Sequence, residues 1–205
     1  MKLISPRWQN TIPVLKVLVL TSHKKLKSNR ILVMNLKHIL IPLTLLATGC
    51  TSTYKHTEAQ KIEIKLDGRK GVLISTSDDG AYGSKQYHNS GRMTANAIRS
   101  AFSKESSNVD VVTYCHGENC LNNIDTGKYG YYVKPEIFHW EDRSTEWSGK
   151  PDRIEIQLIT FDALTKKELA KASFTGKSKW GTFGGDHPQD LLQEPTNKYV
   201  KSLYR

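Results

Sequence analysis

The chain has 205 residues, of which 30 are basic and 20 acidic, and its formal charge is +10. Eight of the basic residues and none of the acidic ones precede Cys50, which leaves 22 basic against 20 acidic residues from Cys50 onward. The basic excess therefore belongs to the amino-terminal stretch. The remainder lacks the strong positive charge that is typical of nucleic-acid-binding proteins, so we expect no nucleic-acid partner.

Residues 1–33 hold seven of these basic residues and an apolar run, residues 12–20, that Pro13 and Lys16 interrupt. No signal peptide needs so long a leader. Two interpretations are open. Either translation starts at Met34 and the preceding residues are an over-extended reading frame, or they form a genuine long leader or a membrane-surface segment. In both cases this stretch stands outside the fold.

The segment directly before Cys50 has the order of a secretion signal. Lys37 makes its start basic, residues 39–46 are apolar, and residues 47–49 are small. The apolar run is too short to cross a bilayer, which takes about 20 residues. It predicts a cleaved signal peptide over residues 34–49. The alternative is a short buried helix that ends in an ordinary cysteine.

This segment resembles the lipobox of bacterial lipoproteins, although Ala47 stands where leucine is commonest. The resemblance implies that Cys50 becomes the first residue of the mature protein and carries several acyl chains, which hold a protein firmly on a membrane. We expect no cofactor besides this covalent lipid. Thr51, which is not the aspartate of inner-membrane lipoproteins, favours the periplasmic face of the outer membrane of a Gram-negative bacterium. Residues 50–60 are polar and aperiodic, which predicts a lipidated flexible tether.

Residues 61–205 are sufficient for a single domain with its own core. Alternating apolar residues predict strands, and apolar residues at helical spacing predict helices. In chain order, the patterns predict strands over 62–66 and 72–77, a helix around 93–104, a strand over 109–114, a short helix around 119–125, strands over 131–140, 154–158 and 169–179, and a helix that ends near 203.

This order predicts the α/β (α+β) class, with a mixed sheet of four or five strands and two or three helices mainly on one face. The order β-α-β-(α)-β-β-β-α implies parallel pairing early in the domain and an antiparallel hairpin later. Pro135 cannot donate a ladder hydrogen bond, so we expect an edge or a bulge at this proline.

The domain contains five distinctive sequence segments: 91–95 (GRMTA), 135–137 (PEI), 139–143 (HWEDR), 146–154 (EWSGKPDRI) and 184–192 (GGDHPQDLL). With them, residues 71–204 resemble an uncharacterised family of proteobacterial lipoproteins that is defined only as a domain of unknown function. The order of elements also resembles the amino-terminal domain of the Tol–Pal translocation protein. Proteins of that wider group mostly bind partners or assemble, which favours a non-enzymatic role, although fold alone does not determine function.

Cys115 and Cys120 are the only cysteines besides Cys50, and His116 lies between them. In an oxidising periplasm, two thiols this close predict a disulfide that closes a small loop. Free thiols are one alternative. A metal site that includes His116 is another, but the sequence lacks a second pair of ligands at metal spacing, and we expect no metal.

The residue types of His139, Glu141 and Asp142 suit acid–base hydrolysis or cation binding. The interleaved Arg143 and Arg153 offer the alternative of neutralising ion pairs on a solvated loop. The sequence contains no nucleophile elbow, metalloprotease helix or phosphate loop, so we expect no catalytic residue.

Trp140, Trp147 and Trp180 lie in or beside polar loops, and exposed tryptophans next to arginine are typical of binding surfaces. The alternative is that these side chains close the ends of a small core. The predicted binding surface consists of Trp140, Glu141, Arg143, Trp147, Lys150, Trp180, Asp186 and His187.

The leading hypothesis is therefore a non-catalytic, lipid-anchored envelope protein. Its expected partners are the membrane, through the lipid, and either another envelope protein or copies of itself. The alternative is a glycan- or peptidoglycan-binding module that uses the loop of Trp147. A hydrolase centred on His139, Glu141 and Asp142 is the third hypothesis.

Overall fold

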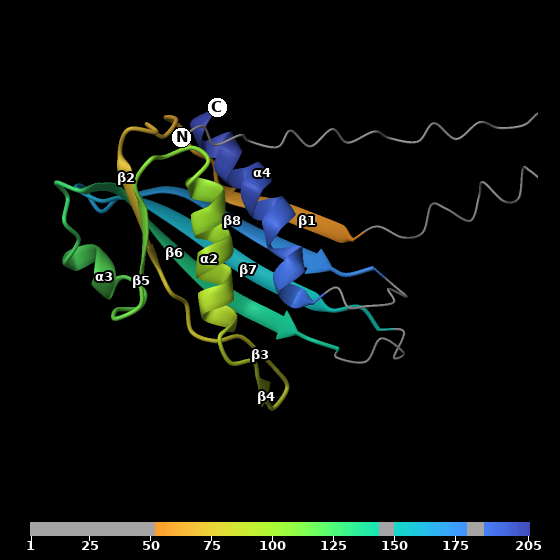
Figure 1. Cartoon of the computed structure of the whole chain (residues 1–205). Coiled ribbons are helices and arrows are strands. Elements are labelled where there is room, and N and C mark those ends of the chain that lie inside the picture. The colour runs from red at the N-terminus through yellow and green to blue at the C-terminus, as the bar shows by residue number, and fades with distance from the viewer. Residues whose placement is uncertain (1–51, 144–149, 180–186) are drawn as a thin grey trace, which may run out of the picture. The chain divides into compact units, whose positions relative to one another are not determined.

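The computed structural model describes residues 52–143, 150–179 and 187–205. All of them belong to one unit of the chain, residues 47–205. Figure 1 shows their helices and strands. In chain order these are β1 (Thr53–Gln60), β2 (Gly71–Ser75), β3 (Ala81–Tyr82), β4 (Lys85–Gln86), α2 (Ser90–Phe102), β5 (Val109–Val112), α3 (Asn119–Asn122), β6 (Tyr129–Glu141), β7 (Arg153–Asp162), β8 (Glu168–Lys177), the 3-10 helix η1 (Pro188–Leu191) and α4 (Gln193–Tyr204).

Six strands form one mixed sheet in the order β1-β8-β7-β6-β2-β5. β2 pairs in parallel with both β5 and β6. The other neighbours, β1 with β8, β8 with β7 and β7 with β6, pair antiparallel. β3 and β4 form a separate two-stranded hairpin. The early β-α-β segment therefore gives parallel pairing and the later strands give antiparallel pairing, as the order of elements predicts.

Helices α2 and α4 lie across one face of the sheet (Figure 1). Ile154, Ile156 and Leu158 alternate along β7, and all three are buried in the main core beneath these helices. Phe174 of β8 contacts Tyr199 of α4, with 5.2 Å between ring centroids. One apolar face of the sheet is thus buried against helices, which is how a sheet removes alternate side chains from water. No helix in the described ranges combines the length and the apolar character that a membrane crossing requires.

The opposite face of the sheet has two different halves. α3 and the turns beside it cover one half, where they close a smaller second core. Its members are Leu73, Val112, Cys120, Leu121, Tyr129, Tyr132, Ile159 and Phe161. We call this the covered half. Along the rest of this face, the alternate residues of β1, β8 and β7 are polar and partly or fully exposed. We call this the open half.

The predicted fold class is confirmed, since one domain holds a mixed sheet with helices mainly on one face. The prediction of a tether over residues 50–60 is wrong for residues 53–60, which form β1 along β8. β1 is polar because it is an edge strand with mostly exposed side chains, and pairing of its backbone with β8 does not depend on apolar residues. His56 adds a stacked contact with Phe174, at 4.9 Å between ring centroids. The extra strand raises the sheet to six strands.

The predicted strand over residues 62–66 is also wrong. Ile64 is 82% exposed, and this segment connects β1 at the edge to β2 inside the sheet. It is attached through Leu66, which is buried and whose N–H donates to the carbonyl of Leu203 at 2.9 Å. The alternating pattern has no strand beside it to pair with.

The expectation at Pro135 is confirmed. β2 pairs with β6 only as far as Val133, so the following part of β6 has β7 as its strand neighbour on one side. A bulge then occurs between Ile137 and His139. The missing N–H of proline is tolerated because no ladder bond is required of it on the free side.

Candidate functional site at the loop end of the sheet

Four strand ends meet at one end of the sheet. Glu141 at the end of β6 pairs with Arg153 at the start of β7, Arg153 pairs with Lys177 at the end of β8, and Lys177 pairs with Thr53 at the start of β1. These residues therefore form one cross-strand row. We call this the loop end of the sheet, because the connections from β6 to β7 and from β8 to η1 leave from it (Figure 1).

A second row runs beside the first on the same face. It consists of His139, Glu155, Thr175 and Lys55. Side chains two residues apart on a strand point to the same side of the sheet, so both rows face away from the main core. A third row of polar residues continues along the open half, and in it the Gln157 amide donates to the Ser173 hydroxyl at 3.0 Å.

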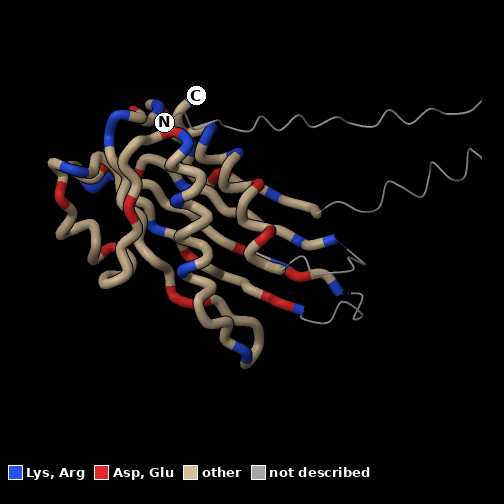
Figure 2. Tube along the Cα trace, viewed as in Figure 1, with Lys and Arg blue, Asp and Glu red and all other residues tan. Residues whose placement is uncertain are grey.

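The first two rows line an open groove of about 360 Å³. Its charged side chains are Lys55, Arg153, Lys177 and Glu155. Figure 2 shows Lys and Arg at these strand ends. The groove therefore offers an anionic group an excess of positive charge, together with the hydroxyls of Thr53 and Thr175 as hydrogen-bond donors.

Glu141 is the buried charge of the site, with 2% of its side chain exposed. Its carboxylate pairs with the guanidinium of Arg143. His139 Nε2 lies 3.3 Å from Glu141 Oε2, and Arg153 Nε lies 4.0 Å from the same oxygen. A buried carboxylate without such partners costs several kcal/mol. These contacts therefore stabilise Glu141 in its buried position and attach the end of β6 to β7.

The structure separates the three residues of the hydrolase hypothesis. His139 and Glu141 are in contact, whereas Asp142 Oδ1 is buried, accepts no hydrogen bond from the described residues and lies 3.9 Å from His187 Nδ1. The Glu141 carboxylate is surrounded by Arg143, Arg153 and His139. The ion pairs of the alternative interpretation are therefore present, but Glu141 is buried at the end of β6 and does not lie on a solvated loop.

Trp140 does not belong to a surface, and this part of the predicted binding surface is wrong. Its side chain is 2% exposed and packs in the main core. The reason is its place on β6, where it pairs with Ile154 and lies between His139 and Glu141, so that it points to the opposite face. A Cβ atom on Gly80 would lie 2.6 Å from Trp140 Cβ, so the neighbouring loop packs too closely for any larger residue.

Trp147, Trp180 and Asp186 of the predicted surface lie outside the described residues. Residues 144–149 belong to the connection from β6 to β7, and residues 180–186 belong to the connection from β8 to η1.

Arg143, Lys150 and His187 border these two segments. The Arg143 guanidinium lies over the ring of Tyr82, 5.5 Å from its centroid. The backbone N–H of Arg143 donates a hydrogen bond to Asp152 Oδ1 at 2.5 Å. Lys150 is exposed, and 52% of the His187 side chain is exposed. Of the predicted surface, Glu141 is buried, so its assignment to an exposed surface is wrong, although it contacts Arg143 directly. Its burial follows from the pairing of its carboxylate with neighbouring basic side chains. Lys150 and His187 lie at the same end of the domain.

Sequence reasoning missed Lys55, Thr175 and Lys177. Lys55 lies in the segment that was predicted to be a tether, and the other two lie on the polar face of a predicted strand. The available signal was the alternation of Thr53 and Lys55 with Tyr54, which is a strand pattern.

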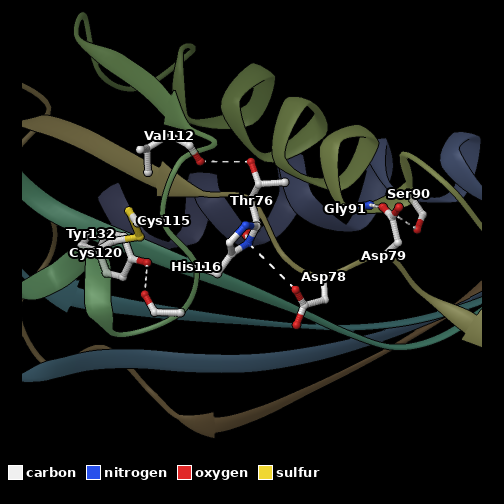
Figure 3. Close-up of polar contacts among 11 residues, drawn as sticks. Thr76, Asp78, Asp79, Ser90, Gly91, Val112, Cys115, His116, Cys120 and Tyr132 are labelled. Atoms are coloured by element: carbon white, nitrogen blue, oxygen red, sulfur yellow. Dashed lines mark hydrogen bonds and ion pairs between the residues drawn. A yellow bond between two sulfur atoms is a disulfide. The ribbon is translucent and has the colours of Figure 1, made fainter.

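The carboxyl ends of the parallel strands β2 and β5 form a second candidate site, because ligands of open α/β sheets bind at such ends. Figure 3 shows that the polar groups there form hydrogen bonds and ion pairs with one another. Asp79 accepts hydrogen bonds from the N–H groups of Asn89 and Gly91, both at 2.9 Å. The amino terminus of α2 therefore already has an internal anion.

Contacts in the same region attach α3 and the turn before it to the sheet (Figure 3). Cys115 and Cys120 form a disulfide, and the Tyr132 hydroxyl donates to the carbonyl of Gly117 at 2.5 Å. Burial raises the pKa of Tyr132, so this hydroxyl stays a donor. His116 Nδ1 lies 3.0 Å from the carbonyl oxygen of Thr76. In the part of the chain that the structure describes, no three metal-ligating side chains converge here or elsewhere.

A sequence profile described as Domain of unknown function (DUF4823) matches residues 64–203. The chain belongs to this family. The match confirms the resemblance to an uncharacterised domain family. It includes the loop-end residues of β6, β7 and β8 of this DUF4823 protein, whereas β1 precedes it. No curated protein matches the chain.

Among solved structures, the chain is similar to PelC from Paraburkholderia phytofirmans, a dodecamer, with a TM-score of 0.56 and 10% identity over 76% of this chain and 99% of PelC. A variant of PelC gives a TM-score of 0.55 and 10% identity, over 75% and 99% of the two chains. A DUF330 protein from Xanthomonas campestris gives 0.45 and 13%, over 70% and 90%. At 10% identity, the similarity to PelC shows a shared fold and nothing further.

Proposed function

We propose that this DUF4823 protein is a non-catalytic, lipid-anchored protein of the cell envelope that assembles with copies of itself. The lipobox-like segment before Cys50 supports the anchor, and Thr51 supports an outer-membrane location. The enclosed carboxylate of Glu141 supports the absence of catalysis. The likeness to the Tol–Pal translocation protein and the proteobacterial origin stay predictions.

The free edge of β1 is the observation that carries the proposal of self-assembly. β1 has eight residues and pairs with β8 on one side. On its other side, no described strand pairs with its backbone. Such an edge is a template for pairing with another chain, and it contains no proline to prevent this.

The two edges of the sheet are unlike, since the other edge strand, β5, has four residues and pairs in parallel with its neighbour. A contact that uses two different surfaces of the same chain is heterologous, and it produces a closed ring when the rotation between copies closes. PelC, which has the same fold, is a dodecamer. We propose a closed oligomer of this DUF4823 protein in which β1 contributes to the contact.

The test of assembly is the mass in solution, over a range of concentrations, of a chain that starts at Thr51. We expect the mass to exceed that of a monomer and to rise with concentration. Thr57→Pro and Glu58→Pro form a matched pair, because adjacent residues of an edge strand direct their N–H groups to opposite sides. The variant that loses the outward N–H should keep its melting temperature and become monomeric. A native chain that stays monomeric throughout contradicts assembly.

The anchor has a separate test. Growth with labelled palmitate should label the protein, and Cys50→Ala should remove the label and release the protein from the membrane fraction. Unlabelled native protein contradicts the anchor, whatever its mass in solution.

Glycan binding is the second candidate, and exposed aromatic rings at the loop end favour it. Tyr82 and Phe138 are 45% and 56% exposed, and the Tyr82 ring lies 5.0 Å from the ring of His139. Aromatic faces beside polar groups suit contacts with sugar rings. Sedimentation with murein sacculi, lost in Tyr82→Ala and in Trp147→Ala but kept in Tyr114→Ala as an exposed aromatic control, would favour this function over self-assembly.

A further inference from the structure

The start of β1 limits the distance between the loop end and the lipid. Thr53 follows Cys50 by three residues, and three extended residues span at most about 10 Å. Thr53 also lines the loop-end groove. When the acyl chains of Cys50 are in a bilayer, the groove therefore lies within about one Debye length of the lipid headgroups.

We propose that the loop-end groove of β1, β8 and β7 is the membrane-facing surface of the domain, where it binds anionic phospholipid headgroups. This inference rests on the lipid anchor of the proposed function. It adds a second, electrostatic contact with the membrane and gives the domain a defined orientation on it.

The charges of the groove suit phosphate groups. Lys55 and Lys177 are exposed, and 48% of the Arg153 side chain is exposed. Because Lys177 stands between Thr53 and Arg153 in the first row, these cations are adjacent rather than scattered. Lysine and arginine bind phosphate through charge-assisted hydrogen bonds.

Three other carboxylates at this end, those of Glu141, Asp142 and Asp152, do not line the groove. Glu141 is buried against Arg143, and Asp142 lies near His187. Asp152 accepts a hydrogen bond from the backbone N–H of Arg143. Glu155 is the carboxylate that lines the groove itself. The surface that meets the headgroups is therefore positive, although the mature chain as a whole is almost neutral.

The far end of the sheet lies too far from the start of β1 to contact the lipid headgroups. β1 has eight residues, and a strand rises about 3.4 Å per residue, so its other end lies about 25 Å from Thr53. With the groove on the headgroups, the strands extend away from the membrane and the edges β1 and β5 face sideways. Neighbouring copies then share one orientation, which is the arrangement that assembly in the membrane plane requires.

The test is binding of the soluble chain that starts at Thr51 to vesicles, measured by flotation. This chain retains all residues of both cores, which run from Leu66 to Leu203. We expect binding to vesicles of phosphatidylglycerol with phosphatidylethanolamine, and much weaker binding to vesicles of phosphatidylcholine with phosphatidylethanolamine. Binding should weaken as salt is added.

Lys55→Gln/Lys177→Gln is the decisive variant. Each basic residue near an anionic surface contributes about five-fold to affinity, so we expect a loss on the order of 25-fold. The matched control is Lys198→Gln/Lys201→Gln, which removes the same charge from exposed positions on α4. Equal losses in both variants, or equal binding of the native chain to both kinds of vesicle, overturn the proposal. Melting temperatures check that both variants are folded.

A dye on the groove measures the orientation directly. An environment-sensitive dye attached to Thr175→Cys should shift its emission on anionic vesicles, whereas the same dye on Lys201→Cys should not. A shift at both positions, or at residue 201 alone, overturns the assigned orientation. Because this chain carries no lipid, these results are independent of palmitate labelling and of the mass in solution, and either proposal can fail without the other.

Discussion

The covered and open halves lie on the same face of the same sheet, yet they differ in every respect that matters for function. β7 crosses both. Its residues on this face change from Arg153, Glu155 and Gln157 in the open half to Ile159 and Phe161 in the covered half. The sheet is apolar where α3 covers it and polar where the described chain leaves it open. The change within one strand thus marks the boundary between packing and an available surface.

The two halves also use charge differently. In the covered half, the Asp110 carboxylate accepts hydrogen bonds from Lys128 and Tyr129 beside the second core. In the open half, one carboxylate is buried with Arg143, and lysines remain exposed along the groove. Local ion pairs therefore stabilise the covered half, whereas the open half keeps positive charge available for a ligand.

The largest expected difference between the halves comes from truncating one residue of β7 in each. Phe161→Ala removes a ring packed near Tyr132, 6.1 Å between centroids, and should lower the free energy of unfolding by about 3 kcal/mol. Gln157→Ala, on the same face of the open half, should change it by less than about 0.5 kcal/mol. Urea unfolding with unchanged slope measures both. Similar losses in the two variants would show that the halves do not differ in packing.

Glu141 is the exception within the open half, and its removal should be the second largest effect. Glu141→Gln leaves the Arg143 guanidinium without its carboxylate. Because 30% of the Arg143 side chain is exposed and water screens it, we expect a loss of about 2 kcal/mol. Glu155→Gln in the adjacent row is the matched control and should be nearly neutral. Adding Arg143→Gln to Glu141→Gln should recover part of the loss, and no recovery would contradict the ion pair.

Removing the disulfide measures how much it contributes to the stability of the covered half. Cys115→Ser/Cys120→Ser opens a loop with a sequence separation of five, and should lower the free energy of unfolding by about 2 kcal/mol. A reductant should destabilise the native protein by the same amount and leave the variant unchanged. Vesicle binding should be unaffected, because the groove lies in the other half. A variant that loses vesicle binding while folded would show that the halves are coupled.

The smallest expected effect is a dependence on pH in the covered half. Hydrogen bonds from Lys128 and Tyr129 hold the pKa of Asp110 below its ordinary value of 3.8. The folded state thus favours the charged carboxylate, so this stabilisation is present above pH 3.8 and is lost as the pH falls through the lower folded pKa. Asp110→Asn should cost less than about 1 kcal/mol at neutral pH. The difference from the native protein should shrink in acid, and a constant difference would exclude this carboxylate as the cause.

Much of the fold was predictable from local pattern. The alternation of Ile154, Ile156 and Leu158 predicts β7 and its buried face, and Pro135 predicts the irregularity of β6. The candidate site was harder to predict. Trp140 and Glu141 were both predicted on the surface, and both are buried. A position next to a polar loop does not reveal which face of a strand a residue occupies or whether a charged side chain is enclosed by its partners.

By itself, the sequence determined the class of fold and the strands of the core, because alternation of apolar residues is a property of neighbours along the chain. Only the tertiary structure decided that residues 53–60 join the sheet. A polar edge strand is stabilised by backbone pairing with β8, and that pairing leaves no strong trace in its side chains. The same pairing brings Lys55 beside Lys177 and Arg153, so the positive groove exists only once strands that are distant in sequence lie side by side.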